Sequence, residues 1–175
     1  MAEFFPQVFY KRQDIKEIVC NLLNKMKAND PIVVECSLNI LKNITEGLVA
    51  TKNEQSLIGS EPMILLQPMV AYFEMKLDEF QKEKEKDNRE KAVIIIMNCL
   101  MKSKDRQVAT HLIEFLMKKY YSIYEINHED VKLMIESILA IMHTAILALE
   151  GSLTNPELLS SIYNLLKTHI AKYGI

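Results

Sequence analysis

Apolar residues recur along this chain with the spacing of an α-helix, most clearly in its first part. Between Ile15 and Met26 they fall at i, i+3, i+4 and i+7, which places them on one helical face. The β-prone run Val93–Ile96 has helical flanks, so we expect no strand there. The pattern predicts an all-α protein of about seven helices, over residues 13–28, 31–50, 61–80, 89–101, 104–121, 129–150 and 154–172.

Capping residues and prolines indicate where these helices begin. Asp30 is a good N-cap, and Pro31 suits the first helical position, where its missing N–H is not needed. Thr154 and Glu157 have the spacing of a capping box. Pro68 falls inside the third predicted helix, so we expect a kink there or two shorter pieces.

Three helix starts share one pattern: DPIVVECSLNILKNI from Asp30, DRQVATHLIEFLMKK from Asp105 and NPELLSSIYNLLKTH from Asn155. Each begins with an Asp or Asn cap, carries an aliphatic residue at its fourth position, and has an apolar-Leu pair at its eleventh and twelfth. Each block is expected to follow a shorter apolar helix across a tight turn. The predicted unit is therefore helix, turn, helix, repeated about three times, and such units bury their faces by stacking.

The clearest unit, Ile15–Ile44, resembles a HEAT repeat, and the whole pattern is similar to HEAT or armadillo-like helical repeats. The resemblance implies stacked antiparallel helix pairs in a short solenoid, which we expect to form a single domain over residues 1–175. HEAT units often carry a basic residue after the turn valine, but Val34, Ala109 and Leu159 stand there in this chain. A compact helical bundle is the alternative architecture.

Composition and charge narrow the class of protein. The chain is 49% hydrophobic and 25% charged, with only four glycines, which is typical of a globular helical protein. Its net charge of −2 argues against direct nucleic-acid binding, which usually needs a basic surplus. The most apolar window, Val131–Leu149, contains Lys132, Glu136 and His143, so we expect a buried helix and no membrane insertion.

The cysteines indicate an intracellular protein, cytoplasmic or nuclear. Three in number and far apart in apolar runs, they are typical of reduced, buried thiols rather than of a zinc site. They are Cys20, Cys36 and Cys99.

No catalytic, cofactor or metal-binding motif is evident, so we expect a non-enzymatic protein. A glycine-rich phosphate loop and a His-Glu-x-x-His motif are both absent from the sequence. His111 and Glu114 have the spacing of half a metal site, which is common by chance, and His143 is expected in the core. An enzyme with an unrecognised site, formed by these three residues, is the third hypothesis.

Polar stripes on three predicted helices are candidates for a partner-binding surface. In stacked helix pairs the second helices commonly line one shared surface, and we assign these stripes to it. The stripes are Glu35, Asn39, Lys42 and Glu46 on the second helix, Thr110, Glu114, Lys118 and Tyr121 on the fifth, and Ser160, Asn164, Lys167 and Ala171 on the seventh.

Aromatic residues and one charged run offer further surfaces. The N-terminal arm, residues 1–12, contains Phe4, Phe5, Phe9 and Tyr10, which either cover the first repeat or insert into a partner or a second copy of the chain. Residues 81–91 alternate in charge and are expected to form a solvated helix end and loop.

These features favour a protein–protein interaction module, an adaptor or subunit of a larger assembly. The alternative is a compact helical bundle that regulates a partner by holding its amphipathic helix in an apolar groove. Methionines at helical, core-like spacing either fill an irregular core or line such a groove. The last helix allows self-association as a homodimer, because its apolar residues exceed what one neighbour would cover: Tyr163, Leu165, Leu166, Ile170 and Tyr173.

Overall fold

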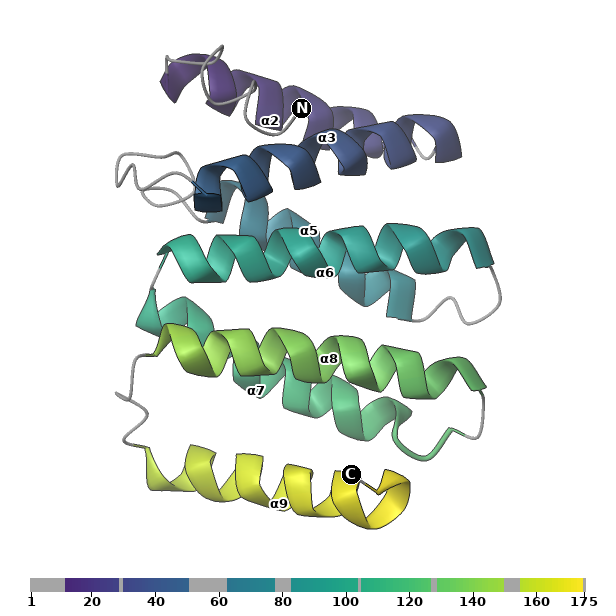
Figure 1. The fold of residues 1–175 in the computed structure, drawn as a ribbon, viewed down its shortest axis with the longest axis vertical. Helices are drawn as coiled ribbons and strands as arrows, with labels where there is room; N and C mark the ends of the chain where they lie inside the picture. Colours follow the sequence, from purple (N-terminus) through teal and green to yellow (C-terminus); the bar gives the residue numbers. More distant parts are fainter. Residues whose placement is uncertain are drawn as a thin grey trace. The chain divides into compact units, whose positions relative to one another are not determined.

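A computed structural model of the chain contains only helices and turns over the residues it describes: 12–28, 30–50, 63–77, 83–103, 105–126, 129–149 and 155–174. The all-α prediction is confirmed, and the predicted helix ends agree to within three residues except at the start of the fourth helix. In the described ranges the helices are α2 (Arg12–Met26), α3 (Pro31–Ala50), α5 (Met63–Leu77), α6 (Glu83–Ser103), α7 (Arg106–Ile123), α8 (Glu129–Ala148) and α9 (Pro156–Tyr173) (Figure 1).

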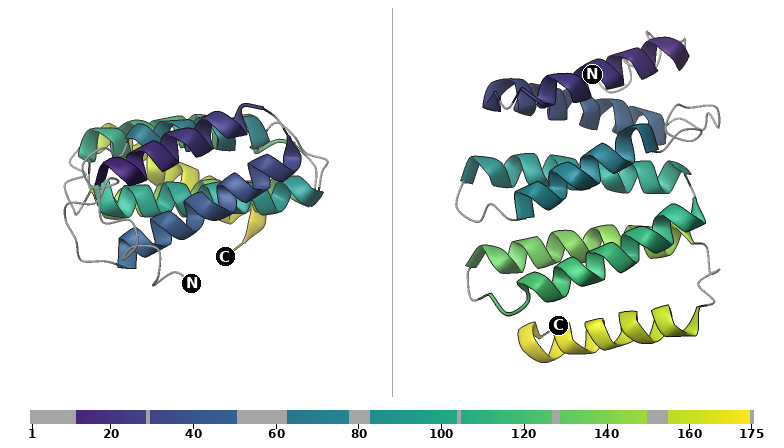
Figure 2. Two further views of the ribbon diagram at one scale, coloured as in Figure 1. Left: turned by 90° about the horizontal axis from the view of Figure 1, so that it is seen from above. Right: turned by 180° about the vertical axis from the view of Figure 1, so that it is seen from behind.

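Two compact units make up the chain, residues 1–104 and 105–175. The first contains two helical hairpins, α2 with α3 and α5 with α6, and α3 packs along α6 so that one hairpin lies beside the other (Figure 2). By contrast, α2 and α5 touch over a short stretch only. Side chains with no exposed surface form its core: Val19, Leu38, Leu41, Phe73, Leu77, Ile95 and Ile96. The expectation of a single domain stays a prediction.

In the second unit α7 packs along α8, and α9 contacts α7. Its core is formed by fully buried residues of α7 and α8 together with Leu165 of α9: Ile113, Leu116, Tyr120, Ile135, Ile138 and Ile141. Only three residues of α9 are buried, so this helix leaves much of its surface uncovered.

The apolar helix α8 is long enough to cross a membrane by length and composition, and it is the only such helix in the part of the chain that the structure describes. Half of its apolar window is buried against the rest of the protein, which is also the behaviour of a core helix. Lys132 and Glu136 on this helix are exposed. The expected absence of membrane insertion stays a prediction.

The three predicted N-caps are confirmed. Asp30 Oδ1 accepts a hydrogen bond of 2.9 Å from the Ile32 amide, and Asp105 Oδ1 accepts one of 3.1 Å from the Val108 amide. Asn155 Oδ1 accepts from the amides of the second and third residues of α9, at 3.0 and 3.3 Å. The N-cap of α9 is therefore Asn155, and the capping-box prediction, which put the cap one residue earlier, is wrong.

Replacing Asp105 with Ala is expected to lower the free energy of unfolding by about 1 kcal/mol, because the Val108 amide loses its acceptor. Urea unfolding followed by circular dichroism measures the change. D105S, which keeps an oxygen acceptor at the cap, is the matched control. A D105A variant as stable as the wild type would contradict the capping role.

Pro68 does not divide its helix, since α5 continues from Met63 to Leu77 with the proline inside it. Of the two alternatives, the division into shorter pieces is therefore wrong, and the kink stays a prediction. Proline has no N–H to donate to the carbonyl four residues earlier, so α5 lacks one internal hydrogen bond. Burial compensates for this loss, because Leu65, Leu66 and Met69 on either side of Pro68 are almost completely covered.

The charged run 81–91 is not a loop as far as the structure describes it. From Glu83 onward it is the first part of α6, and its later residues Asn88, Arg89 and Lys91 are buried. Alternating acidic and basic residues support a helix through pairs four residues apart, and Lys91 pairs with Asp87 at 2.7 Å. The prediction of a solvated helix end and loop is corrected to a helix with one buried side.

The sequence pattern that begins at Asp30 and again at Asp105 does not start at the same place in the two helical hairpins. Since α6 begins early, it is longer than α7, 21 residues against 18, and α8 with 20 residues is also longer than α9. The expected shorter first helix therefore holds only for α2 before α3. Within its unit α7 pairs with the following helix α8, whereas α3 pairs with the preceding helix α2. The helices α3 and α7 consequently occupy different places in their hairpins.

Candidate protein-binding groove

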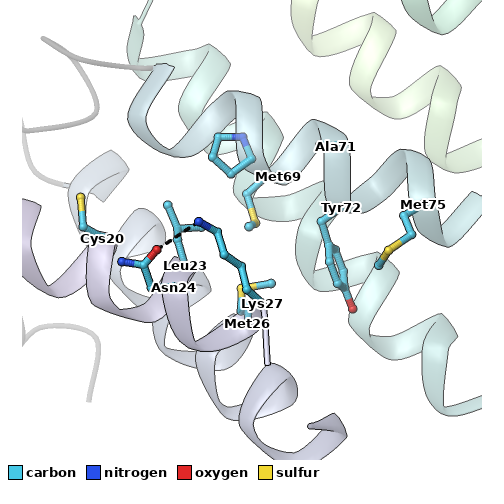
Figure 3. A pocket seen from close by; sticks show the side chains of 10 residues that line it. Cys20, Leu23, Asn24, Met26, Lys27, Met69, Ala71, Tyr72 and Met75 are labelled. Carbon is cyan, nitrogen blue, oxygen red and sulfur yellow. Dashed lines mark hydrogen bonds between the residues drawn. The ribbon is translucent and has the colours of Figure 1, made fainter. Parts of the chain in front are cut away.

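A groove of about 480 Å³ lies between α2 and α5 in the first unit (Figure 3). It opens where these two helices diverge, because they touch over a short stretch only. Its lining comes from both helices and from the turn that follows α2: Cys20, Leu23, Asn24, Met26, Lys27, Pro68, Met69, Ala71, Tyr72 and Met75.

The two walls of the groove have the same helical spacing. Positions 20, 23, 24 and 27 on one wall and positions 68, 71, 72 and 75 on the other follow the pattern i, i+3, i+4 and i+7. Met26 and Met69 also line the groove, and Lys27 lies in the turn directly after α2. The shared spacing is that of one continuous helical face. The groove therefore runs along two turns of each helix instead of forming a round hole.

Methionines make the groove apolar and able to adapt its shape to a ligand. Met26 of α2 and Met69 of α5 are buried lining residues, and Met75, also on α5, is exposed. An unbranched thioether side chain adapts its shape to what packs against it. The methionine spacing allowed either a core or a groove, and at these three positions the structure contains both.

One cation borders the groove, and its ten lining residues include no carboxylate. The Lys27 ammonium donates a hydrogen bond of 3.2 Å to Asn24 Oδ1, which holds the lysine against α2 (Figure 3). The groove thus combines apolar walls with one positive charge at its edge.

The cysteine prediction is partly wrong. Cys20 in the groove and Cys36 on α3 are exposed thiols, whereas Cys99 is buried. Burial raises the pKa of Cys99 to about 12, so this thiol stays protonated and unreactive. The apolar neighbours of Cys20 and Cys36 in sequence occupy the inward side of each helix, which leaves these two on the outer side.

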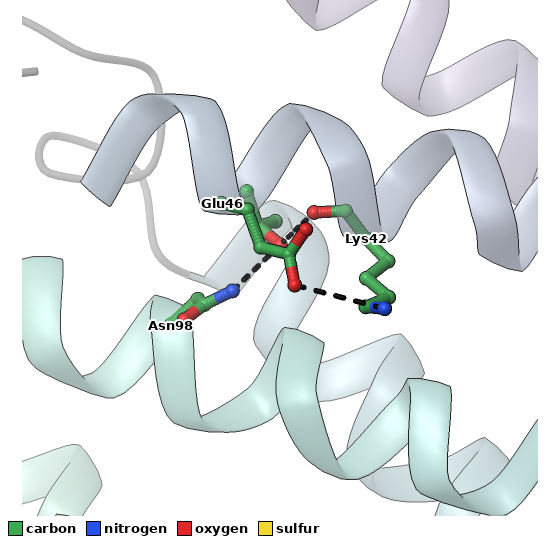
Figure 4. A network of polar contacts seen from close by, with 4 residues as sticks. Lys42, Glu46 and Asn98 are labelled. Carbon is green, nitrogen blue, oxygen red and sulfur yellow. Dashed lines mark hydrogen bonds and ion pairs between the residues drawn. The ribbon is translucent and has the colours of Figure 1, made fainter. Parts of the chain in front are cut away.

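The predicted polar stripe of α3 contains two ion pairs at the protein surface, and its role in partner binding stays a prediction. Glu35 lies 3.7 Å from the ammonium of Lys91 on α6, and Lys42 lies 3.7 Å from Glu46 on its own helix (Figure 4). Asn39 is exposed. The contact between Glu35 and Lys91 was not predicted from the sequence, because the charged run that contains Lys91 was expected to be solvated.

A partly buried hydrogen bond joins α3 to α6 beside this stripe. Asn98 Nδ2 donates to Thr45 Oγ1 at 3.1 Å, and Thr45 Oγ1 donates to the Lys42 carbonyl at 2.9 Å (Figure 4). Thr45 has no exposed surface. This pair positions the two helices and is not available to a partner.

The remaining candidate partner-binding residues lie on the second unit or, for the N-terminal arm, outside the described residues. Their role in partner binding stays a prediction. Exposed are Glu114, Lys118 and Tyr121 of α7 and Ser160, Asn164, Lys167 and Ala171 of α9, while Thr110 is half-buried and donates to the Arg106 carbonyl. Phe4, Phe5, Phe9 and Tyr10 of the N-terminal arm lie outside the described residues.

An aromatic cluster joins the end of α7 to the end of α9. The Tyr120 ring stacks on Tyr124 with centroids 5.5 Å apart, and its hydroxyl lies 3.3 Å from Nδ1 of His169. The Lys172 ammonium lies 4.0 Å from the centre of the Tyr124 ring and donates to the Tyr124 carbonyl. This tyrosine cluster therefore packs inside its own unit, except for the exposed Tyr121.

Burial lowers the pKa of His169 below its ordinary value of 6.5, and the opposing attraction of Glu136 is smaller. The unfolded chain binds a proton there more readily, so the contribution of His169 to stability is present above pH 6.5 and lost as the pH falls through its folded pKa. We expect the unfolding temperature to fall between pH 7.5 and pH 5, and by less in H169Q. An equal fall in both proteins would contradict this role; H143Q, at an exposed histidine of α8, is the control.

The enzyme hypothesis named three residues, of which two are on α7 and one is on α8. His111, Glu114 and His143 are all exposed, and the expectation that His143 lies in the core is wrong. Among the described residues no three His, Cys, Asp or Glu side chains are placed to hold a metal ion. The apolar character of α8 misled the prediction for His143, because this helix has an outer side on which that residue lies.

Comparison of the chain with protein-family models, with curated proteins and with solved structures gave no match.

Proposed function

We propose that the chain is a non-enzymatic interaction module, an adaptor or subunit that binds another protein through the groove between α2 and α5. The observation that carries the proposal is the pair of matched helical faces that form the groove walls. Its proposed occupant is an amphipathic helix of the partner, whose apolar side packs between the two walls.

The shape and lining of the groove support a helical occupant. Two diverging helices present ridges at i, i+3, i+4 and i+7, into which the side chains of a third helix can interdigitate. A groove that spans two turns suits about two turns of the partner, roughly 10 Å at 1.5 Å per residue. The lining methionines, Met26, Met69 and Met75, allow packing against side chains of different shapes.

Charge specifies the partner further. Because Lys27 borders the groove and no carboxylate lines it, the bound helix is proposed to carry an acidic residue beside its apolar face. A basic amphipathic helix would meet a like charge at this edge.

The proposed architecture is a short HEAT-like stack. The antiparallel hairpins α2/α3 and α5/α6, packed side by side through α3 and α6, support this arrangement in the first unit. The exposed thiols Cys20 and Cys36 support an intracellular, reducing compartment, where such groups persist without forming disulfides.

Two neighbouring lysines provide a matched test of the groove. Lys27 lines it, whereas Lys25 is exposed on α2 and is not a lining residue. We expect K27E to weaken partner capture by about tenfold, because the change reverses the charge that meets the acidic residue, and K25E to leave capture nearly unchanged. Quantitative mass spectrometry of proteins retained by each purified chain from the native cell measures both. Equal capture by K27E and K25E would contradict the assigned edge.

A further inference from the structure

A continuous apolar stripe is exposed on α9. Its residues retain a large share of their accessible surface: Leu159 44%, Tyr163 66%, Leu166 45% and Ile170 46%. Leu158, Ile162 and Leu165, next to the stripe on the same helix, are buried in the second unit. The helix is therefore apolar on two adjacent faces, of which its own unit covers one.

The spacing of this stripe is the same in both directions along the chain. Its members follow each other by four, three and four residues, which is the seam spacing of paired helices. A two-fold axis across the middle of α9 therefore places Leu159 against Ile170 of a second copy, and Tyr163 against Leu166. Such a self-complementary surface is what a two-fold dimer interface requires.

We propose that two copies of this chain associate through the α9 stripe, with their α9 helices antiparallel. This homodimer goes beyond the proposed function, because it involves the second unit and not the α2–α5 groove. Each pairing in the seam joins two large apolar side chains, and none of the four positions carries a charge.

Charge favours the antiparallel direction. The first turn of α9 contains Glu157 and the last turn contains Lys172. Antiparallel pairing brings the acidic first turn of one copy level with the basic last turn of the other, and it also opposes the two helix dipoles. Parallel pairing would bring like charges and like dipole ends together.

The size of the stripe is that of a weak, transient interface. Four side chains of about 200 Å² each, roughly half exposed, give about 400 Å² per copy, below the roughly 800 Å² of a standard interface. We therefore expect a weak dimer, with a dissociation constant on the order of 10 µM, because the interface is small.

Light scattering and sedimentation of the full chain between about 1 and 200 µM test this proposal, a range set around the expected dissociation constant. The wild type is expected to shift from monomer to dimer, while L166E stays monomeric across the range. N164E, which adds the same charge at an exposed position outside the stripe, is the control and is expected to dimerise. A wild type that stays monomeric at the highest concentration would overturn the proposal, as would a dimer that L166E leaves intact.

Cysteine pairing tests the geometry without relying on the folding of L166E. In a C20S/C36S background, a mixture of L159C and I170C chains is expected to form a disulfide between the two variants under mild oxidation. L159C alone is expected to form little, because two-fold pairing separates its copies by 11 residues of helix, roughly 16 Å. Crosslinking of L159C with itself as the main product, or no crosslink in the mixture, would overturn antiparallel pairing.

Discussion

Replacing Ala71 with Glu is expected to reduce partner binding at least about 100-fold, equivalent to about 2.8 kcal/mol. Ala71 is an exposed residue of the α5 wall, so a longer side chain there enters the groove without disturbing the core. The new carboxylate opposes the acidic residue proposed for the partner, and it becomes a buried, poorly paired charge if the partner still binds. Isothermal titration or quantitative capture of the identified partner measures the loss.

Two control variants separate the causes of this loss. N21E adds the same charge at an exposed residue of α2 that does not line the groove, and it is expected to bind normally. A71Q fills the groove to the same extent without the charge, so its binding gives the steric share of the effect. Wild-type affinity in A71E would show that the partner binds elsewhere, with the polar stripes of α3, α7 and α9 as the next surface to test.

Replacing Phe73 with Ala is expected to lower the free energy of unfolding by about 3–5 kcal/mol. Phe73 has no exposed surface and lies two residues beyond Ala71, which puts it on the side of α5 away from the groove. A cavity of this size in a chain of ordinary stability removes a large part of the total of about 5–15 kcal/mol. Chemical unfolding followed by circular dichroism gives the change.

The variant F73L is the conservative comparison. It keeps most of the buried volume and is expected to cost less than about 1.5 kcal/mol. If F73A and F73L cost the same small amount, Phe73 would not be the side chain that holds α5 against the core. The groove would then lack the rigid wall that the proposed function requires.

Sequence alone predicted the helices well because local signals define them. At each cap the side-chain oxygen accepts a hydrogen bond from a backbone amide two or three residues later, as the structure shows for Asp30, Asp105 and Asn155. The start of α6 was the exception, since its first residues are charged and the apolar period begins later. Burial of Asn88 and Arg89 depends on packing against other helices, which an alternating charge pattern does not show.

The groove could not be predicted from the sequence for a similar reason. Its walls are separated by more than forty residues, and the α2 wall mixes polar with apolar side chains: Cys20, Leu23, Asn24 and Lys27. The α2 wall therefore lacks the uniform character that marks a surface in sequence. The matching spacing of the two walls becomes meaningful only once α2 and α5 are known to lie together. By contrast, the sequence of the last helix predicted more apolar side chains than one neighbouring helix covers. The exposure of Tyr163, Leu166 and Ile170 confirms this prediction.

Photocrosslinking from inside the groove tests the central claim most directly. A photoreactive amino acid at position 71, in the full chain expressed in its native cell, reacts with whatever occupies the groove, and the same group at position 21 reports on the surface outside it. We expect one main adduct from position 71, with a protein whose crosslinked segment is an acidic amphipathic helix, and little of it from position 21. Equal labelling from both positions, or no protein adduct from position 71, would contradict it.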